Sequence, residues 1–433
     1  MSVIARMFMT AGLLAGLCAP AATAQLVFDG AVMDRAGLVE RAGVSALRVT
    51  SDGGEATTID PRGTARTRPA ADLIALVPRT WADGGAPTLT IQPDAWDIAG
   101  GAFLELADGE RFVGRPGSVS AEGESIAWVH ERFGTITLPL DAVAGFVLRP
   151  GVEVAGLSAD VKADTLWLVN GDRLEGFLEA IGPRDGGEGF TLTLESGGSR
   201  VSVPVDQVVR ARLANPRRAA QGPMVWLSDG SVIAATTIAS EGQGQGVRIT
   251  PAAVRTNTQP KGPDSESTEI AGSAVFGADE INAIAFDASR LAPLAGLEVV
   301  SYRPIGLPRR PGPRVIETEV LPAPLGAADV ILPGPMEVEW ALPAGAQRIV
   351  GNARLDEPDW AWGECEVTIE IISGNAPREI ARTRLDGATS SSPIAADLGA
   401  PAKAGDRLRV RIEPGERGPI RDRVRLERVI VLR

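Results

Sequence analysis

The chain concentrates side chains able to do chemistry in one short stretch that ends at Glu364. Within about ten residues it places several carboxylates, two indole rings and a preceding arginine. Proteins hold a sugar by stacking an aromatic face on its apolar face, while charged groups bond the hydroxyls. This combination predicts a carbohydrate contact made by Arg354, Asp356, Asp359, Trp360, Trp362 and Glu364.

Two other interpretations of this cluster stay open. Hard cations prefer several carboxylate oxygens, so the acids could bind a structural calcium ion. Alternatively, the tryptophans fill the end of a folded domain and the acids face solvent. No other cofactor and no transition-metal site is expected.

Arginines recur at alternate positions near the C-terminus, which places each row on one face of a strand. Guanidinium groups suit carboxylate and sulfate geometry, so the rows could contact an acidic polysaccharide. They could equally pair with Glu413, Glu416 and Glu427 on a solvated sheet face. The rows are Arg407, Arg409 and Arg411, and Arg421, Arg423 and Arg425.

Catalytic patterns are sparse. His130 is the only histidine, so a Ser-His-Asp triad would have to use it, and the nucleophile motif G-x-S-x-G does not occur. The glycine-rich stretch 182–189 lacks the lysine of a phosphate-binding loop. We therefore expect a protein that is not an enzyme.

The N-terminus predicts export. Residues 1–24 have a basic start, a short apolar core and the small residues Ala22 and Ala24 before the expected cleavage point, as in a secretory signal peptide. The core is too short to span a bilayer, and no second apolar run follows, so the mature chain should have no transmembrane segment. Cys18 raises a lipoprotein alternative, but Leu17 stands where that signal needs a small residue. A secreted, periplasmic or cell-envelope protein is expected.

Charge and cysteine content narrow the classes further. The formal net charge is −12, whereas a nucleic-acid partner would require a basic surface to neutralise phosphates. After removal of the signal peptide only Cys365 remains, so no internal disulfide can form. The fold must then depend on its apolar cores, with no nucleic-acid partner.

A repeat organises the centre of the chain. Leu104–Gly114, Leu166–Gly176 and Val225–Ile233 each read as a strand, an Asp-Gly or Asn-Gly pair, and a second strand. Such pairs predict hairpins with type I′ turns. Each copy closes with an acidic segment before another apolar run, and the copies recur about every 60 residues.

The repeats define the domain boundaries. We expect a degenerate first repeat over 25–94 and clear repeats over 95–152, 160–216 and 222–294, the last with a disordered insertion near 256–268. Their hairpin and closing strand resemble tandem Sm-like small β-barrels of secreted bacterial proteins. That resemblance implies barrels of about five strands.

The C-terminal region changes pattern after a Pro-rich stretch, 295–313, which predicts a linker. Residues 314–433 alternate apolar and polar side chains, as in sandwich strands. Residues 338–346, 350–357, 362–367 and 418–424 resemble the NPCBM family, a β-sandwich often attached to secreted glycan-active proteins. Asp422 is followed by Arg423 where that family often carries an aromatic and a histidine.

The sequence thus predicts an all-β protein: tandem small β-barrel-like repeats followed by a C-terminal jelly-roll β-sandwich. A non-catalytic binding protein whose sandwich contacts a polysaccharide or cell-envelope glycan is expected. The alternative is a structural or assembly protein of the cell envelope, whose repeats make protein–protein contacts without binding glycan.

Overall fold

The computed structural model contains only β-strands and short 3-10 turns in the residues it describes, which confirms the all-β prediction. No helix in these ranges has the length and apolar character needed to cross a membrane. The predicted signal peptide and the insertion near 256–268 lie outside the described residues. The structure describes residues 28–50, 52–78, 101–117, 125–152, 162–184, 189–241, 246–252, 272–306, 311–316, 321–356, 362–374, 376–416, 418–419 and 421–433.

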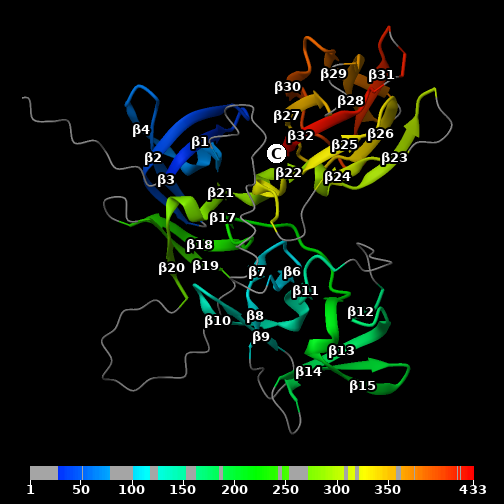
Figure 1. Ribbon diagram of the computed structural model, residues 1–433. Helices are drawn as coiled ribbons and strands as arrows, with labels where there is room; N and C mark the ends of the chain where they lie inside the picture. The colour runs from blue at the N-terminus through cyan, green and yellow to red at the C-terminus, as the bar shows by residue number, and fades with distance from the viewer. Residues whose placement is uncertain are drawn as a thin grey trace, which may run out of the picture.

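Four units with the same order of elements make up the first two thirds of the chain (Figure 1). Each has four successive strand regions, a 3-10 turn and a closing strand. Unit 1 contains β1 (Phe28–Asp34), β2 (Val39–Thr50), β3 (Gly53–Ile59), β4 (Ala65–Pro69), η1 (Ala70–Asp72) and β5 (Leu73–Pro78). Unit 2 contains β6 (Phe103–Leu106), β7 (Arg111–Val113), β8 (Arg115–Pro116), β9 (Ser125–His130), β10 (Gly134–Pro139), η2 (Leu140–Ala142) and β11 (Val143–Val147).

The third and fourth units repeat this order, and unit 1 has all of its elements despite its divergent sequence. Unit 3 contains β12 (Asp164–Leu168), β13 (Arg173–Pro183), β14 (Phe190–Ser196), β15 (Ser199–Pro204), η3 (Val205–Gln207) and β16 (Val208–Arg212). Unit 4 contains β17 (Met224–Leu227), β18 (Val232–Ser240), β19 (Val247–Pro251), β20 (Ala274–Phe276), η5 (Ala278–Glu280) and β21 (Ile281–Ala285).

The repeated hairpins form, but the predicted turn type is wrong. Gly109, Gly171 and Gly230 have φ between 88° and 94°, while the Asp or Asn before each has no positive φ. In the first hairpin, the Gly109 N–H donates to Leu106 O and the Leu106 N–H donates to Glu110 O. This pattern is a three-residue loop in which a type I turn is followed by a left-handed glycine.

Corresponding strands of different units pair with each other. In each one the first strand pairs with the second and the closing strand. The closing strands then pair antiparallel between units, β5 with β21 and β11 with β16, and the second strands β2 and β18 also pair. Strand pairing therefore continues across the boundary between units 1 and 4 and between units 2 and 3, and β7 of unit 2 also pairs with β18 of unit 4.

The C-terminal region is a two-sheet β-sandwich with one apolar core between the sheets. One sheet has the order β24-β25-β32-β27-β30, with β22 also paired to β32, and the other β23-β26-β31-β28-β29. The strands are β22 (Leu291–Pro293), β23 (Val299–Pro304), β24 (Arg314–Ile316), β25 (Asp329–Leu332), β26 (Met336–Ala341), β27 (Arg348–Leu355), β28 (Cys365–Ser373), β29 (Ala376–Leu385), β30 (Ser391–Asp397), β31 (Arg407–Pro414) and β32 (Val424–Leu432). Three further 3-10 turns are η6 (Ala288–Arg290), η7 (Leu294–Gly296) and η8 (Pro324–Gly326).

The linker prediction for 295–313 is wrong over part of its length. Val299–Pro304 forms β23 and pairs with β26 inside the sandwich. β22, just before the predicted linker, already pairs with the last strand, β32. Proline is tolerated at a sheet edge, where an N–H is not needed for pairing, so a Pro-rich composition did not exclude an edge strand here.

The sandwich packs directly on units 1 and 4 through a separate apolar cluster. Met33 of β1, Ile74 of β5 and Ala283 of β21 meet Val350 of β27 and Ile430 of β32, and all are buried. This contact fixes the sandwich against the repeats at the side where the chain leaves unit 4 (Figure 1).

Candidate functional site

The predicted carbohydrate cluster lies where the chain passes from β27 in one sheet to β28 in the other. Asp356, the first residue after β27, is 3% exposed. Its Oδ1 accepts hydrogen bonds from Arg425 Nε at 2.9 Å and Nη2 at 2.6 Å, and Arg423 Nη1 lies 3.5 Å from Oδ2. Asp356 thus joins β27 to β32 and is already engaged by two guanidinium groups.

Glu364 lies immediately before β28 and is also buried. Its carboxylate pairs with Arg384 of β29, and its backbone N–H donates to Asp422 Oδ1 at 3.2 Å. Asp422 is itself 1% exposed. The acid that the sequence places before the final strand is therefore a buried link between the starts of β28 and β32.

Arg354 is engaged in the same way, whereas Trp362 is presented to solvent. Arg354 Nε lies 2.9 Å from Glu427 Oε1, and Asn352 Nδ2 donates to the other oxygen of Glu427 at 2.7 Å. Trp362 is 63% exposed. Asp359 and Trp360 lie outside the described residues. Of the predicted set, the structure therefore presents one exposed aromatic ring, two residues before the ion-paired Glu364.

These residues do not form a set of ligands that would support the calcium interpretation. Asp356 and Glu364 each have a carboxylate bound to arginine, and they begin or end strands of different sheets. In the described ranges, no three or more His, Cys, Asp or Glu side chains are grouped so that they could hold a metal ion.

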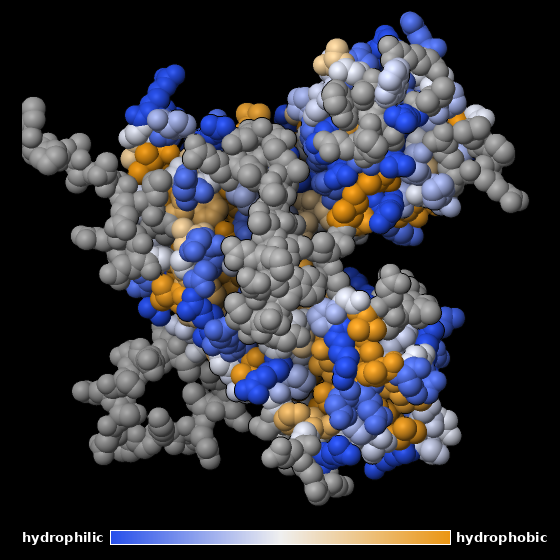
Figure 2. All heavy atoms as spheres, in the orientation of Figure 1, coloured by the Kyte–Doolittle hydropathy of each residue, from blue (hydrophilic) through white to orange (hydrophobic). Residues whose placement is uncertain are grey.

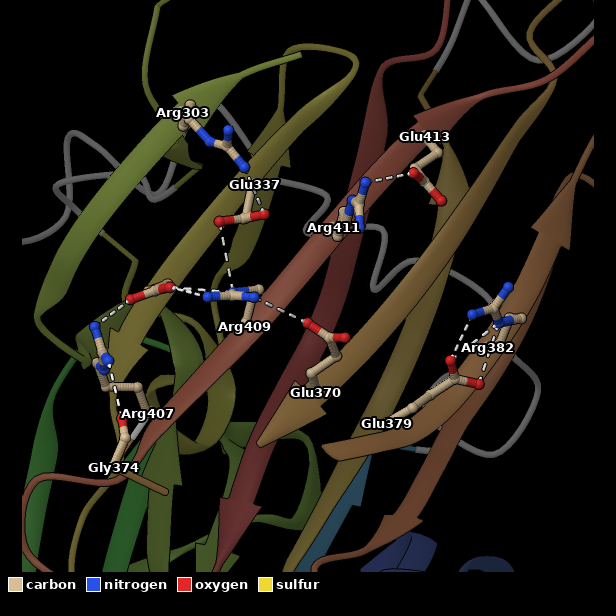
Figure 3. A network of polar contacts seen from close by, with 11 residues as sticks. Arg303, Glu337, Glu370, Gly374, Glu379, Arg382, Arg407, Arg409, Arg411 and Glu413 are labelled. Carbon is tan, nitrogen blue, oxygen red and sulfur yellow. Dashed lines mark hydrogen bonds and ion pairs between the residues drawn. The ribbon is translucent and has the colours of Figure 1, made fainter. Parts of the chain in front are cut away.

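The first arginine row lies on the outer face of β31 and is paired with glutamates of the flanking strands and, at Arg411, with Glu413 of β31 itself (Figure 3). Arg407 Nη1 and Arg409 Nη2 bind the two oxygens of Glu339 at 2.6 and 2.7 Å. Arg409 also bonds Glu370 of β28 at 3.3 Å, and Arg411 bonds Glu413 at 2.6 Å. Each guanidinium in this row therefore already has a carboxylate partner.

Burial and pairing oppose each other at Arg409. Burial alone would lower the pKa of its guanidinium, but the hydrogen bond with Glu339 and the charges of Glu337 and Glu370 raise that pKa above its ordinary value. A polyanion would have to displace these carboxylates. The face thus supports the predicted pairing with glutamates better than contact with an acidic polysaccharide, although the partners are mainly Glu339 and Glu370.

His130 meets a serine and an aspartate, but the arrangement is not that of a catalytic triad. Its Nδ1 accepts the backbone N–H groups of Arg132 and Phe133 at 3.0 and 3.3 Å, so the ring proton lies on Nε2. Nε2 then faces both Ser231 Oγ at 3.2 Å and Asp229 Oδ2 at 3.5 Å. A triad needs the aspartate on the opposite nitrogen from the serine.

These contacts join two units instead. His130 belongs to β9 of unit 2, whereas Asp229 and Ser231 belong to the hairpin of unit 4, and Ser231 is fully buried. Burial alone would raise the pKa of Asp229, but hydrogen bonds from His130 and Ser231 lower it below its ordinary value.

Cys365 is not a reactive thiol either. Burial, with Asp422 and Glu364 nearby, raises the pKa of its thiol to about 12.

Sequence reasoning missed one site, a cavity of about 480 Å³ where unit 2, unit 4 and the sandwich meet. We call it the junction cavity. Its lining includes Glu110, a buried acid whose equivalents in the other clear hairpins are Asp172 and Ser231. A longer acid at that position was visible in the aligned repeats, but its burial depends on the neighbouring unit, which the alignment does not show.

No protein-family model matches the chain, and no curated protein matches it. Part of the chain is similar to a solved CBM51 from Clostridium perfringens GH95 in complex with methyl-galactose, at 12% identity over 33% of this chain and 99% of that one, with a TM-score of 0.25. It is also similar to the tandem CBM51 modules of Sp3GH98, the family 98 glycoside hydrolase from Streptococcus pneumoniae SP3-BS71, at 11% identity over 76% and 87%, with a TM-score of 0.25.

Proposed function

We propose that this chain is an exported, non-catalytic binding protein whose C-terminal sandwich contacts carbohydrate through the exposed face of Trp362. The carrying observation is the contrast between that ring, 63% exposed, and its surroundings, where Asp356 and Glu364 are buried in ion pairs. An exposed indole is a platform on which the apolar face of a sugar can stack. Trp360 is proposed as a second ring of the same platform.

The test is glycan binding by the mature full-length chain. We expect Trp362→Ala to weaken binding to an immobilised oligosaccharide panel by about tenfold or more, because loss of ring stacking removes at least ~1.4 kcal/mol. Phe177→Ala, which truncates an equally exposed ring on unit 3, is the matched control and should bind as the parent does. Binding that survives both Trp362→Ala and Trp360→Ala would refute the platform.

The proposal of a non-catalytic role has its own support. His130 is buried, and both ring nitrogens are engaged: Nδ1 by backbone N–H groups of unit 2 and Nε2 by Ser231 of unit 4. A general base must instead reach a substrate proton. Turnover of any bound oligosaccharide, seen as new reducing ends and abolished by a point substitution, would contradict this part of the proposal.

Assembly through the repeats is the second candidate, and a specific observation favours it. Like strands already join unit 1 to unit 4 and unit 2 to unit 3. Unit 3, however, has no described strand pairing from its second strand β13 to another unit, and it exposes Phe177 by 65% and Val169 by 53%. Figure 2 shows hydrophobic surface over this unit at the lower right. Such a patch is typical of protein contacts.

The assembly candidate is tested by self-association. Sedimentation of the mature chain should show a concentration-dependent oligomer that Phe177→Glu converts to monomer, because a buried charge in an apolar contact is costly. Trp362→Ala is the control and should leave the oligomer intact. A parent chain that stays monomeric up to high micromolar concentration would argue against this candidate.

A further inference from the structure

The junction cavity is built from three parts of the chain that are distant in sequence. The β6–β7 hairpin of unit 2 supplies its polar side, β17 of unit 4 supplies Trp226, and the turns η7 and η8 of the sandwich supply an apolar side that includes Leu325. The cavity exists only because the sandwich packs on the repeats. Its volume of about 480 Å³ lies within the range of about 300–1,000 Å³ typical of small-molecule sites.

Glu110 is the most unusual group in this cavity. It is 3% exposed, and its Oε1 accepts the backbone N–H of Ala234 in β18 at 2.8 Å. Burial, with a further contribution from Asp108, raises the pKa of Glu110 to about 8. At neutral pH the carboxyl is therefore mainly protonated and can both donate and accept a hydrogen bond.

A charged row forms the floor beside Glu110. Glu105 lies directly opposite Arg111 on β7 and opposite Gly145 on β11, and Gly145 in turn lies opposite Arg212 on β16. Residues opposite each other in a sheet share a face, and Gly145 has no side chain, so Glu105 faces arginines on both sides. The row offers donors and acceptors held in place by the sheet.

Another part of the lining is apolar. Trp226, Leu291, Pro293 and Leu325 line it. Leu325 has φ of 58°, a conformation that costs a non-glycine residue about 1–3 kcal/mol, and it is 2% exposed at the contact between sandwich and repeats. The packing of the sandwich against the repeats thus holds the apolar side in position.

We propose that the junction cavity binds a saccharide of one or two sugar units, with Glu110 and the Arg111–Glu105–Arg212 row bonding its hydroxyls and the Trp226 side covering its apolar face. A hydroxyl can accept from and donate to a neutral carboxyl, and fixed arginine and glutamate side chains bond neighbouring hydroxyls. An ammonium ligand would instead require Glu110 to be ionised. The proposal takes its ligand class from the proposed function but assigns a separate site.

The experiment measures binding of cellobiose, lactose and N,N′-diacetylchitobiose to the mature full-length chain by calorimetry. At least one should bind near neutral pH and weaken as the pH rises above about 8, when Glu110 loses its proton. Glu110→Gln should retain this binding without the pH dependence, because an amide also donates and accepts. Glu110→Ala should weaken it by about tenfold.

A variant that fills the junction cavity distinguishes loss of binding from loss of folding. Gly296 lines the cavity, is exposed, and has no atom within 4 Å of the position a Cβ would take, so Gly296→Trp can enter the cavity without disturbing the backbone. It should abolish binding in the cavity while its melting temperature stays near that of the parent. Trp362→Ala should leave this binding unchanged.

The outcomes separate the two sites. Saccharide binding lost in Trp362→Ala but kept in Glu110→Ala and Gly296→Trp overturns the cavity and leaves the sandwich platform standing. The reverse pattern supports the cavity and, if binding also survives Trp360→Ala, removes the platform. An affinity for these neutral saccharides that rises above about pH 8 would overturn the cavity proposal, because it would require the ionised form of Glu110. No binding of the three saccharides would also overturn the cavity proposal, whereas the platform is judged by the wider oligosaccharide panel.

Discussion

Single side chains in this protein are fixed by hydrogen bonds that cross from one unit to the next. Ser231 of unit 4 accepts the N–H of Val113 at 3.1 Å and contacts His130, both in unit 2. Glu110 of unit 2 accepts the N–H of Ala234 in unit 4. These polar residues hold units 2 and 4 together.

The role of His130 leads to a graded prediction. His130→Ala removes the acceptor for two backbone N–H groups and should destabilise the chain by about 2–4 kcal/mol. His130→Asn retains an acceptor near the position of Nδ1 and should cost about half as much. Chemical denaturation measures both, and equal losses would show that the Nδ1 contacts contribute nothing.

The raised pKa of Glu110 predicts that the stability of the folded chain depends on pH. Its folded-state pKa, about 8, lies above the reference value of 4.5, so the folded state holds the proton more tightly than the unfolded state. The stabilisation is complete below about pH 4.5 and is lost as the pH rises towards 8, by an amount on the order of several kcal/mol. Glu110→Gln should flatten this slope in denaturation at pH 5, 7 and 9. Glu175→Gln, on an exposed strand position, should follow the parent curve.

At the scale of elements, the hairpin turns depend on backbone conformation more than on side-chain contacts. Gly171 has φ of 88°, and a Cβ built there meets no atom within 4 Å. Gly171→Ala should therefore cost about 1–2 kcal/mol from the left-handed conformation alone. Gly171→Asn should cost less, because asparagine tolerates that region. Thermal unfolding of the two variants measures both losses of stability. A smaller loss for Gly171→Ala than for Gly171→Asn would contradict the turn assignment.

The face of the five-stranded sheet shows the same dependence on neighbours. Arg407, Arg409 and Arg411 stand on one strand face, as their alternation predicts. Whether they are free or paired depends on β26 and β28, which place Glu339 and Glu370 beside them. A single strand's sequence gives the direction of its side chains, whereas the identity of the neighbouring strands decides their partners.

At the scale of the whole molecule, docking of the sandwich on units 1 and 4 should be separable from folding. Val350 is 5% exposed in the contact, and Gly37 of unit 1 lies so close that a Cβ there would fall 2.3 Å from Val350 Cγ1. Val350→Lys should undock the sandwich, which small-angle scattering would record as a larger radius of gyration with unchanged β content. Ser373→Lys, on an exposed position, should scatter like the parent. An unchanged radius for Val350→Lys would show that other contacts hold the domains together.

Alternation and turn residues alone determined that this chain is all-β, that hairpins recur near Gly109, Gly171 and Gly230, and that strands with one apolar face follow in the C-terminal region. These features depend on interactions between residues close in sequence, which a pattern records. The type of turn, the strand at 299–304, the pairing of units and the junction cavity depend on contacts between segments far apart in sequence. Only the tertiary structure decided those, because which strand lies beside another is set by packing of complete faces and not by any one strand's own residues.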